Sequence, residues 1–511
     1  VPPAPAGIIK PAGEPPTLCR YVPCFQTVMP RLPILPALFL GALLVGGCGS
    51  PQDGARRADD RPNVILVMAD DLGYGDVGAY GQTKIHTPAL DALAGEGTVF
   101  TQFYSGSAVC APARSVLMTG QHTGHTPIRD NKEITPIGQH PLPDSSVTMA
   151  EVLGNAGYRT AAMGKWGLGP PDSEGAPTRQ GFDVFYGYLG QRRAHHYYPE
   201  FLFYNGERAP LPGNTVEDDR TSPGSGPPIT KGTYSHDAIA DSALAFIRRN
   251  QDRPFFLYLP FTIPHVDIAA PDAAWAPYRN EDGTSIFPET PYDGGSYGYV
   301  PVDQPNAGYA AMVTRMDRDI GRIKTLVEKL GLAKDTIILF TSDNGPTWII
   351  YDLEVFDSNG SFRGHKRDLY EGGIRVPMIA WGPGRIPAGR RDDTVWAMWD
   401  LLPTLAAYAG TAVPADIDGL NFVPTLSGTP EAQEQHTHLY WEIYGPNPAQ
   451  AVRAGRWKAV RTPLGDGAIE LYDLMSDPAE RSDLSTLYPA VSRRMDSLMA
   501  ASRTPSALFP E

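Results

Sequence analysis

Four short apolar segments, each ending in a polar or charged side chain, constrain the fold of this chain most strongly. They are "NVILVMADD" (63–71), "TAAMGKW" (160–166), "PFFLYLPFTIPH" (254–265) and "TIILFTSDNG" (336–345). Uninterrupted apolar runs of this length are typical of buried strands, and the amphipathic segments between them favour an α/β layer architecture. Ligands bind at the carboxyl ends of the strands in open α/β sheets. We therefore expect the four polar endings to meet in one site.

The segments between these runs predict helices and long loops. Apolar residues recur at spacings of three and four over 310–330, and Gly331 supplies a stop, which predicts a helix. A shorter helix is expected over 146–156. Two segments rich in Gly, Pro and aromatic residues, about 205–235 and 270–306, lack either periodicity and are predicted to be loops that wall a binding site.

The texture of the sequence changes after about residue 428. Short segments such as "HLYWEIY", "QAVRAGRWKAVRT" and "AIELYDL" indicate antiparallel strands, followed by a helix near 488–501. We predict a large α/β domain at 62–428, with a central, mostly parallel mixed sheet flanked by helices. A small C-terminal α+β domain with an antiparallel sheet and a helix is predicted at 429–511.

The N-terminal 61 residues are predicted to be a targeting region. Residues 1–28 are Pro-rich and are expected to be a mis-annotated extension, whereas 29–48, "MPRLPILPALFLGALLVGGC", has the pattern of a bacterial lipoprotein signal peptide that ends at a lipidated Cys48. Residues 49–61 are then a tether. The apolar run within 29–48 is short for a membrane span. We expect a periplasmic or surface lipoprotein that contacts the membrane only through its lipid; a plain anchor or a cleaved secretory signal is the alternative.

The charge balance restricts the class of partner. The formal net charge is −14 and the pI is about 5.3, which argues against nucleic-acid binding. An acidic chain can still bind anionic substrates, because a bound cation and a few local bases can override the mean field.

Cys110 is the only cysteine after position 48, and it lies in "SAVCAPARSVLMTG" (107–120). Pro112 suits the first turn of a helix, so Cys110 is expected near a helix N-terminus, a location that lowers a thiol pKa. These residues alone are compatible with a cysteine hydrolase or with a buried structural cysteine.

The pattern Cys, small residue, Pro, small residue, Arg, then four residues and Thr-Gly resembles the signature of the formylglycine-dependent type I sulfatases of the alkaline phosphatase superfamily. The resemblance extends over about 62–485. It implies that a maturation enzyme converts Cys110 to formylglycine, whose hydrate has two hydroxyls on one carbon. One would attack the sulfur of a sulfate ester, and the second would then expel sulfate and restore the aldehyde.

The resemblance also implies a calcium site. The segments "NVILVMADDLGYGDVGAYG" and "TSDNGP" match the family's two metal-binding segments, which assigns Asp70, Asp71, Asp343 and Asn344 as ligands of one Ca²⁺ together with the hydrate at Cys110. A donor set made only of oxygen atoms suits Ca²⁺ better than zinc.

Basic residues at family positions complete the implied site. Arg114 is the signature arginine that orients the hydrate, and Lys165 and Lys366 resemble the two sulfate-binding lysines. His265 matches the histidine that contacts the sulfate and its leaving oxygen. Together they would place positive charge where negative charge develops on the transferring group.

The sequence departs from the family pattern at Gly167. Many sulfatases have a histidine at this position, in "GKWH", whereas this chain has "GKWG". His195 and His196, in "QRRAHHYYPEF" (191–201), are the candidate replacements, and an aromatic surface turn is the alternative. We predict that His195 faces the pocket as a catalytic and substrate-binding residue.

The sequence thus predicts a calcium-dependent sulfatase, arylsulfatase-like, acting on a sulfated carbohydrate or an aryl sulfate. A phosphonate or phosphodiester hydrolase of the same superfamily is one alternative. A glycan-binding lipoprotein with an unconverted Cys110 and no catalytic activity is another.

Overall fold

The computed structural model describes residues 60–510, except 135, 218–221 and 296–297. The predicted extension, signal peptide and lipidation site at Cys48 therefore lie outside the described residues, as does all of the predicted tether before residue 60. The described residues belong to one compact unit, which runs from Arg57 to Glu511. In the described part of the chain, no helix combines the length and the apolar composition that a membrane crossing requires.

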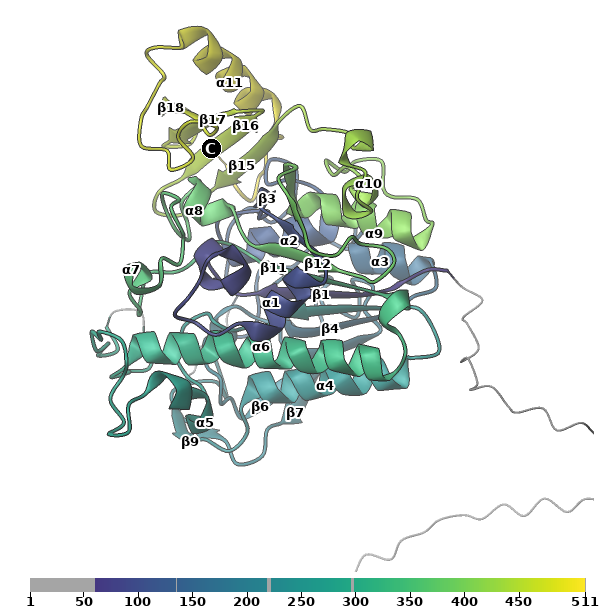
Figure 1. The fold of residues 1–511 in the computed structure, drawn as a ribbon, viewed down its shortest axis with the longest axis vertical. Helices are drawn as coiled ribbons and strands as arrows, with labels where there is room; N and C mark the ends of the chain where they lie inside the picture. The colour runs from purple at the N-terminus through teal and green to yellow at the C-terminus, as the bar shows by residue number, and fades with distance from the viewer. Residues whose placement is uncertain (1–59, 135, 218–221, 296–297, 511) are drawn as a thin grey trace, which may run out of the picture. The chain divides into compact units, whose positions relative to one another are not determined.

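A ten-stranded mixed sheet forms the centre of this unit (Figure 1), in the order β13-β2-β12-β11-β1-β10-β4-β5-β6-β7. Its strands are β1 (Asn63–Ala69), β2 (Thr98–Phe100), β4 (Arg159–Lys165), β5 (Val184–Tyr188), β6 (Phe201–Tyr204), β7 (Glu207–Pro210), β10 (Phe255–Pro260), β11 (Thr336–Ser342), β12 (Met378–Trp381) and β13 (Arg390–Asp392). The five strands from β11 to β5 run parallel, and antiparallel pairs continue the sheet on either side. The predicted mixed, mostly parallel sheet is confirmed.

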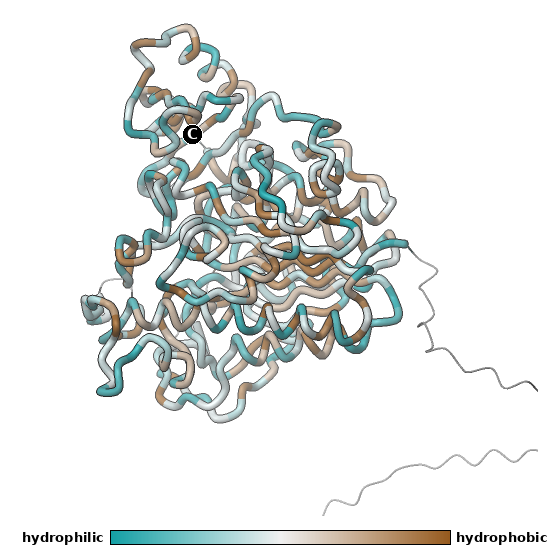
Figure 2. Tube along the Cα trace, viewed as in Figure 1, coloured by the Kyte–Doolittle hydropathy of each residue, from teal (hydrophilic) through white to brown (hydrophobic). Residues whose placement is uncertain are grey.

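The four apolar runs form adjacent parallel strands in the middle of this sheet. β1 pairs with β10 on one side and with β11 on the other, and β10 pairs with β4. Every residue of β1 is buried, which explains its uninterrupted apolar sequence, because a strand covered on both faces has no solvated side. Figure 2 shows the hydrophobic stretches gathered along these central strands.

Helices cover both faces of the sheet. Alternate residues of β1 belong to two different apolar cores: Ile65 and Val67 pack with α4 and α6, whereas Leu66 and Met68 pack with α2, α3 and α9. The helices are α1 (Pro88–Gly95), α2 (Cys110–Thr119), α3 (Met149–Asn155), α4 (Ser235–Arg249), α5 (Asp272–Trp275), α6 (Pro305–Lys329), α7 (Leu353–Phe356), α8 (Glu371–Ile374), α9 (Leu401–Ala409), α10 (Val423–Leu426) and α11 (Pro489–Ala501).

A second, four-stranded antiparallel sheet lies in the C-terminal part, as predicted. It consists of β15 (Leu439–Ile443), β16 (Ala449–Ala454), β17 (Trp457–Thr462) and β18 (Ala468–Asp473), and α11 packs against it. Trp441 of this sheet belongs to the same apolar core as α2 and α9, and its indole donates a hydrogen bond to the Ser105 carbonyl at 2.9 Å. The Ser105 hydroxyl in turn donates to the backbone carbonyl of Asp343 at 2.5 Å. The small sheet therefore contacts the segment that precedes Cys110.

Three predicted elements differ from those observed. The segment 270–306, predicted to be a loop, contains the short helix α5 and the first residues of α6. Helix α6 begins at Pro305 rather than at 310, with the proline in the first turn that suits it. Gly308, a weak helix former, obscured this start in the sequence, and a Cβ at that position would overlap Ile268 and Trp275. The segment 205–235, predicted to be a loop, contains β7 and the antiparallel pair β8 (Thr215–Val216) and β9 (Pro228–Thr230). These strands are two to four residues long, too short to show a period.

Candidate active site

The polar endings of the four central strands meet at the carboxyl edge of the sheet, as predicted. The Lys165 ammonium lies 2.6 Å from Asp70 Oδ2, and the His265 ring nitrogen Nε2 lies 3.5 Å from Asp71 Oδ2. The backbone N–H of Asp71 donates to Asp343 Oδ1 at 3.1 Å. Four strands that are distant in the sequence therefore contribute to one buried polar cluster.

Both acids at the end of β1 can face this cluster because the chain leaves its extended conformation between them. Asp71 has φ +64°, in the left-handed region that residues other than glycine rarely adopt. In a continuing strand, neighbouring side chains would point to opposite faces. The left-handed residue removes that alternation, and both carboxylates are buried in the site.

Cys110 is the first residue of α2, as predicted, and its side chain is buried. Its Sγ atom lies 3.6 Å from Asp70 Oδ1. Burial raises the pKa of the Cys110 thiol to about 12, and the nearby charges of Lys165 and Lys366 only partly oppose it. The pKa of this thiol is therefore raised, contrary to the expectation from a helix N-terminus, because the cost of desolvating a thiolate is the dominant cause.

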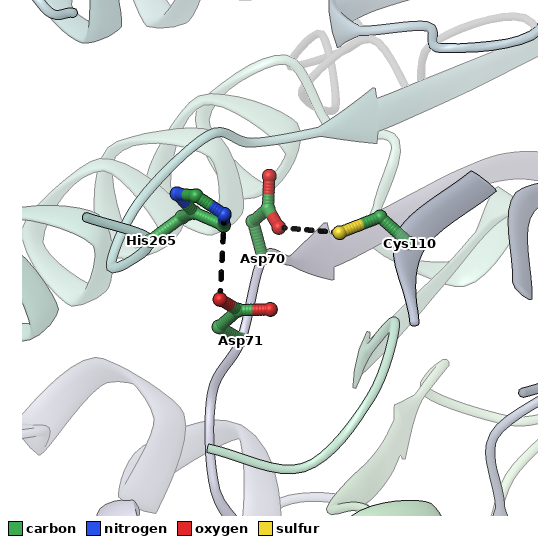
Figure 3. Close-up of side chains that lie close together, drawn as sticks. All are labelled: Asp70, Asp71, Cys110 and His265. Atoms are coloured by element: carbon green, nitrogen blue, oxygen red, sulfur yellow. Dashed lines mark hydrogen bonds and ion pairs between the residues drawn. The ribbon is translucent and has the colours of Figure 1, made fainter. Parts of the chain in front are cut away.

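A tight group of possible metal donors surrounds Cys110 (Figure 3). Single ligand atoms of Asp70, Asp71, Cys110 and His265 all lie within 4.8 Å of one another. Asp343, which the sequence analysis included among the ligands, lies one hydrogen bond from Asp71. His265, which the sequence analysis assigned to the substrate, belongs to the tight group itself.

Asn344 provides the observation that tests whether these residues fit a calcium ion. Its side-chain N–H group donates to Asp71 Oδ1 at 2.7 Å, so its carbonyl oxygen is the end left for another partner. The Oδ1 atom of Asn344 is buried and has no hydrogen-bond partner among the described residues. A buried amide oxygen beside three carboxylates is the kind of donor set that Ca²⁺ prefers. The residues present therefore fit this ion.

The carboxylates are matched by three buried cations. The Lys366 ammonium lies 2.7 Å from Asp71 Oδ2, and the Arg114 guanidinium lies 2.6 Å from Asp343 Oδ2 and 3.6 Å from Asp70 Oδ2. Burial and the neighbouring Asp70 charge raise the pKa of Asp343. Burial alone would lower the pKa of Lys366, but Asp71, Cys110 and Asp70 together outweigh it and raise the pKa, so this lysine is charged. The site is thus rich in both signs of charge.

His265 is held in one tautomer by its own backbone. Its Nδ1 atom contacts the Val266 carbonyl, which can only accept a hydrogen bond, so Nδ1 carries the proton and Nε2 keeps a lone pair directed at the cluster. Burial, together with the positive charges of Lys366 and Lys165, lowers the pKa of His265 well below its usual value. The ring is therefore neutral at neutral pH.

His195 reaches the same place from the 3-10 turn Arg192–His195. Its ring stacks on that of His265, with 4.9 Å between the centroids. Burial and the charge of Lys165 lower the pKa of His195 well below its usual value. The residue is half-buried, and its ring lies against His265 at the edge of the cluster.

His196 has a different role from its neighbour. Its Nδ1 atom lies 2.6 Å from the buried Asp267 carboxylate, and the Asp267 N–H donates to the His195 carbonyl at 2.9 Å. This pair links the turn that carries His195 to the loop that carries His265. Sequence reasoning missed Asp267, although its position two residues after His265 in "PHVD" is a signal that could have indicated it.

An exposed tryptophan lies beside the cluster. Trp348 is 44% exposed, and its ring stacks on His365 with 4.1 Å between the centroids. His365 directly precedes Lys366, whose N–H donates to the Pro346 carbonyl at 2.9 Å. A large apolar ring is thereby held at the surface, next to the residues that carry the buried charge.

Comparison with known proteins agrees with this geometry. Residues 62–411 match the family model described as Sulfatase, and residues 360–503 match the model described as N-sulphoglucosamine sulphohydrolase, C-terminal. The first match covers more than half of the chain.

Curated relatives and solved structures cover most of the chain. N-acetylgalactosamine-6-sulfatase of the dog (Canis lupus familiaris) is 32% identical over 457 residues, which cover 83% of this chain and 74% of that protein. Human arylsulfatase A is 31% identical over 465 residues, covering 83% of each. The crystal structure of Ps i-CgsB in complex with k-i-k-neocarrahexaose superposes with a TM-score of 0.71 at 27% identity, covering 88% of this chain and 95% of that one.

Proposed function

This chain belongs to the sulfatase family, and from that premise we propose that it hydrolyses sulfate esters of a carbohydrate or an aryl alcohol through a formylglycine at position 110, assisted by Ca²⁺. The observation that carries the proposal is the position of Cys110. This residue is the first of α2, and its side chain lies within reach of Asp70. The surrounding buried cluster also holds Lys165 and Lys366.

Conversion of Cys110 to formylglycine explains how a buried cysteine with a raised thiol pKa can supply the nucleophile. The pKa of the Cys110 thiol, raised to about 12 by burial, leaves almost no thiolate at neutral pH. Formylglycine, once formed by a maturation enzyme and hydrated, supplies two hydroxyls on one carbon, one to attack sulfur and one to expel sulfate afterwards. The cysteine is then a precursor, and its own acidity does not limit the reaction.

Asp70, Asp71, Asp343 and Asn344 would hold the calcium ion, with the oxygen of the converted residue 110. Two features support a cation at this place: the unpartnered Asn344 Oδ1 atom, and the pKa of Asp343, which is raised by burial and by the neighbouring Asp70 charge. When bound, Ca²⁺ supplies positive charge that lowers the pKa of a hydroxyl beside it.

The basic residues have separable roles in the proposed reaction. Lys165 and Lys366 bind the sulfate group, because their ammonium groups end in the cluster and a sulfate ester offers anionic oxygen atoms. Arg114 orients residue 110, one helical turn away on α2, while it holds Asp343 and Asp70. Charge placed before the reaction begins needs no reorganisation as negative charge develops.

The two stacked histidines are suited to proton transfer. His265 is neutral with a lone pair on Nε2, so it can accept a proton from residue 110 or donate one to the leaving oxygen after it has been charged. His195 lies against it and is neutral for the same physical reason. Two neutral imidazoles in contact allow one to accept a proton while the other contacts the sulfate.

Trp348 favours a carbohydrate as the substrate. A sugar ring presents an apolar face that packs well on an exposed aromatic ring, and Trp348 is held in place by His365 beside Lys366. Of the relatives named above, one is by its name a sulfatase of N-acetylgalactosamine, and another was crystallised with k-i-k-neocarrahexaose. We propose a sulfated glycan over a free aryl sulfate.

Parallel assays test the proposed activity. Turnover of an aryl sulfate should exceed that of the matching aryl phosphodiester, and Cys110→Ala should reduce sulfate turnover by about 10³-fold or more while the protein stays folded. A preference for the phosphodiester would favour the phosphonate or phosphodiester hydrolase. Sulfatase activity of Cys110→Ala within about tenfold of the parent would contradict the mechanism.

We further propose that the protein is a lipoprotein of the bacterial cell envelope, on the basis of the pattern at 29–48 alone. A protein starting at Met29 should incorporate labelled palmitate and partition with membranes, and its Cys48→Ala variant should not. Equal labelling of both would contradict lipidation at Cys48.

A further inference from the structure

The missing side chain at Gly167 is replaced in space by that of Gln191. Gly167 follows Lys165 and Trp166 at the end of β4 and has φ +75°, which favours glycine. A Cβ atom on residue 167 would overlap Nε2 of Gln191. The glycine and the glutamine are thus a matched pair, because the absence of a side chain at one position makes room for the amide of the other.

The Gln191 amide is buried without a partner. The residue is 5% exposed, and neither Nε2 nor Oε1 has a hydrogen-bond partner among the described residues. Burying an amide that makes no hydrogen bond costs free energy, and an apolar side chain of similar shape would avoid that cost. An unpartnered amide in a native site therefore calls for a ligand that pairs with it.

The position of this amide points to the reaction centre. The same Cβ position on residue 167 lies only 3.6 Å from Cδ of Arg114. The guanidinium of Arg114 holds Asp343 and Asp70. Gln191 also immediately precedes the 3-10 turn that ends at His195. One short segment therefore brings an amide to the Arg114 side and an imidazole to the His265 side of the same cluster.

We propose that Gln191 is a substrate-binding residue whose side-chain N–H group donates a hydrogen bond to an oxygen of the sulfate group. This inference rests on the proposed sulfatase function and extends it to a residue outside the family pattern. An amide cannot accept a proton at neutral pH, so proton transfer is left to His195 and His265, and Gln191 binds and orients. The pair Gly167–Gln191 then supplies a neutral donor where a histidine stands in the "GKWH" pattern.

The test uses the mature, calcium-loaded enzyme and inorganic sulfate as the probe. In Gln191→Met, the affinity for sulfate measured by calorimetry should fall by about tenfold, the scale of one lost hydrogen bond to a charged group. The melting temperature should stay the same or rise, because the variant removes a buried amide that has no partner in the protein. Turnover of an aryl sulfate should fall with the affinity.

Gln180→Met is the matched control. Gln180 is also buried, but its amide donates to the Glu174 carbonyl at 2.9 Å. Its variant should melt at a lower temperature and bind sulfate as the parent does. If Gln191→Met instead melts lower and binds sulfate with parental affinity, the amide is structural and the inference is overturned. If the parent itself neither binds sulfate nor cleaves sulfate esters, the proposed function fails and this inference fails with it.

Discussion

At the scale of single residues, the two adjacent histidines show how contacts separate side chains of the same type. His195 stacks on His265 inside the cluster, whereas His196 pairs with the buried Asp267 carboxylate. The sequence analysis named both residues as candidates and favoured His195 as the catalytic residue. The contact with Asp267 gives His196 a structural role, because removing the imidazole leaves a buried carboxylate without its hydrogen-bond partner.

We predict that His195→Ala lowers turnover by about 10²-fold, the usual scale for a general acid–base group, and leaves the melting temperature close to that of the parent. His196→Ala should lower the melting temperature, because Asp267 loses its partner. Kinetics and thermal melts of both variants check this split. Parental turnover of the His195→Ala enzyme would contradict the role of His195, and His265 would then be the one histidine left for proton transfer in this account.

At the scale of elements, the sequence predicts what depends on strand periodicity and on strand ends. Asp70, Asp71, Lys165 and Asp343 could be placed together because each follows a buried apolar run, and the carboxyl ends of parallel strands share one edge. The contact between Gly167 and Gln191 could not be predicted, because it depends on where an irregular segment crosses the end of β4. The pKa of Cys110 differs from the expectation because its dominant cause is burial, which is a property of the whole fold.

The turn after β1 carries the prediction for the metal. Asp71→Ala removes a carboxylate from the donor group and leaves the Lys366 ammonium without its 2.7 Å partner. We expect lower calcium content by elemental analysis and a loss of turnover of at least about tenfold. Asp393→Ala, at an exposed position, should behave like the parent. Full activity of a chelated enzyme that contains no metal would contradict the calcium assignment.

At the scale of the whole molecule, the C-terminal sheet packs against the segment that leads to the site. Trp441 belongs to the main apolar core and contacts the segment before Cys110 through Ser105. We call this contact between the C-terminal sheet and the main core the seam. His122, three residues after the end of α2, lies in it, with 5.4 Å between the centroids of its ring and that of Tyr440. The two sheets are therefore expected to depend on each other for stability.

This seam should weaken in acid. Burial lowers the pKa of His122 from 6.5 to about 3, although Asp418 opposes the shift. The unfolded chain therefore takes up a proton at this residue before the folded protein does. The stability that depends on a neutral His122 is complete above about pH 6.5 and is lost as the pH falls toward 3, by about 2 kcal/mol at pH 5.

The variant His122→Asn tests this account. An Asn carbonyl can replace Nδ1, which accepts the Gly124 N–H at 3.2 Å, but it does not titrate. Its free energy of unfolding should therefore change less between pH 7 and pH 5 than that of the parent. His86→Asn, at an exposed position, should keep the parental pH dependence. Identical slopes for His122→Asn and the parent would exclude His122 as the source of acid sensitivity.

The central claim is that Cys110 becomes the nucleophile only after conversion, and peptide mass spectrometry of the active enzyme tests it most directly. The peptide that spans residue 110 should have lost one sulfur and two hydrogen atoms and gained one oxygen, and the converted fraction should rise in proportion to sulfatase turnover across preparations. Full sulfatase turnover in a preparation whose residue 110 is entirely unmodified cysteine would contradict the account.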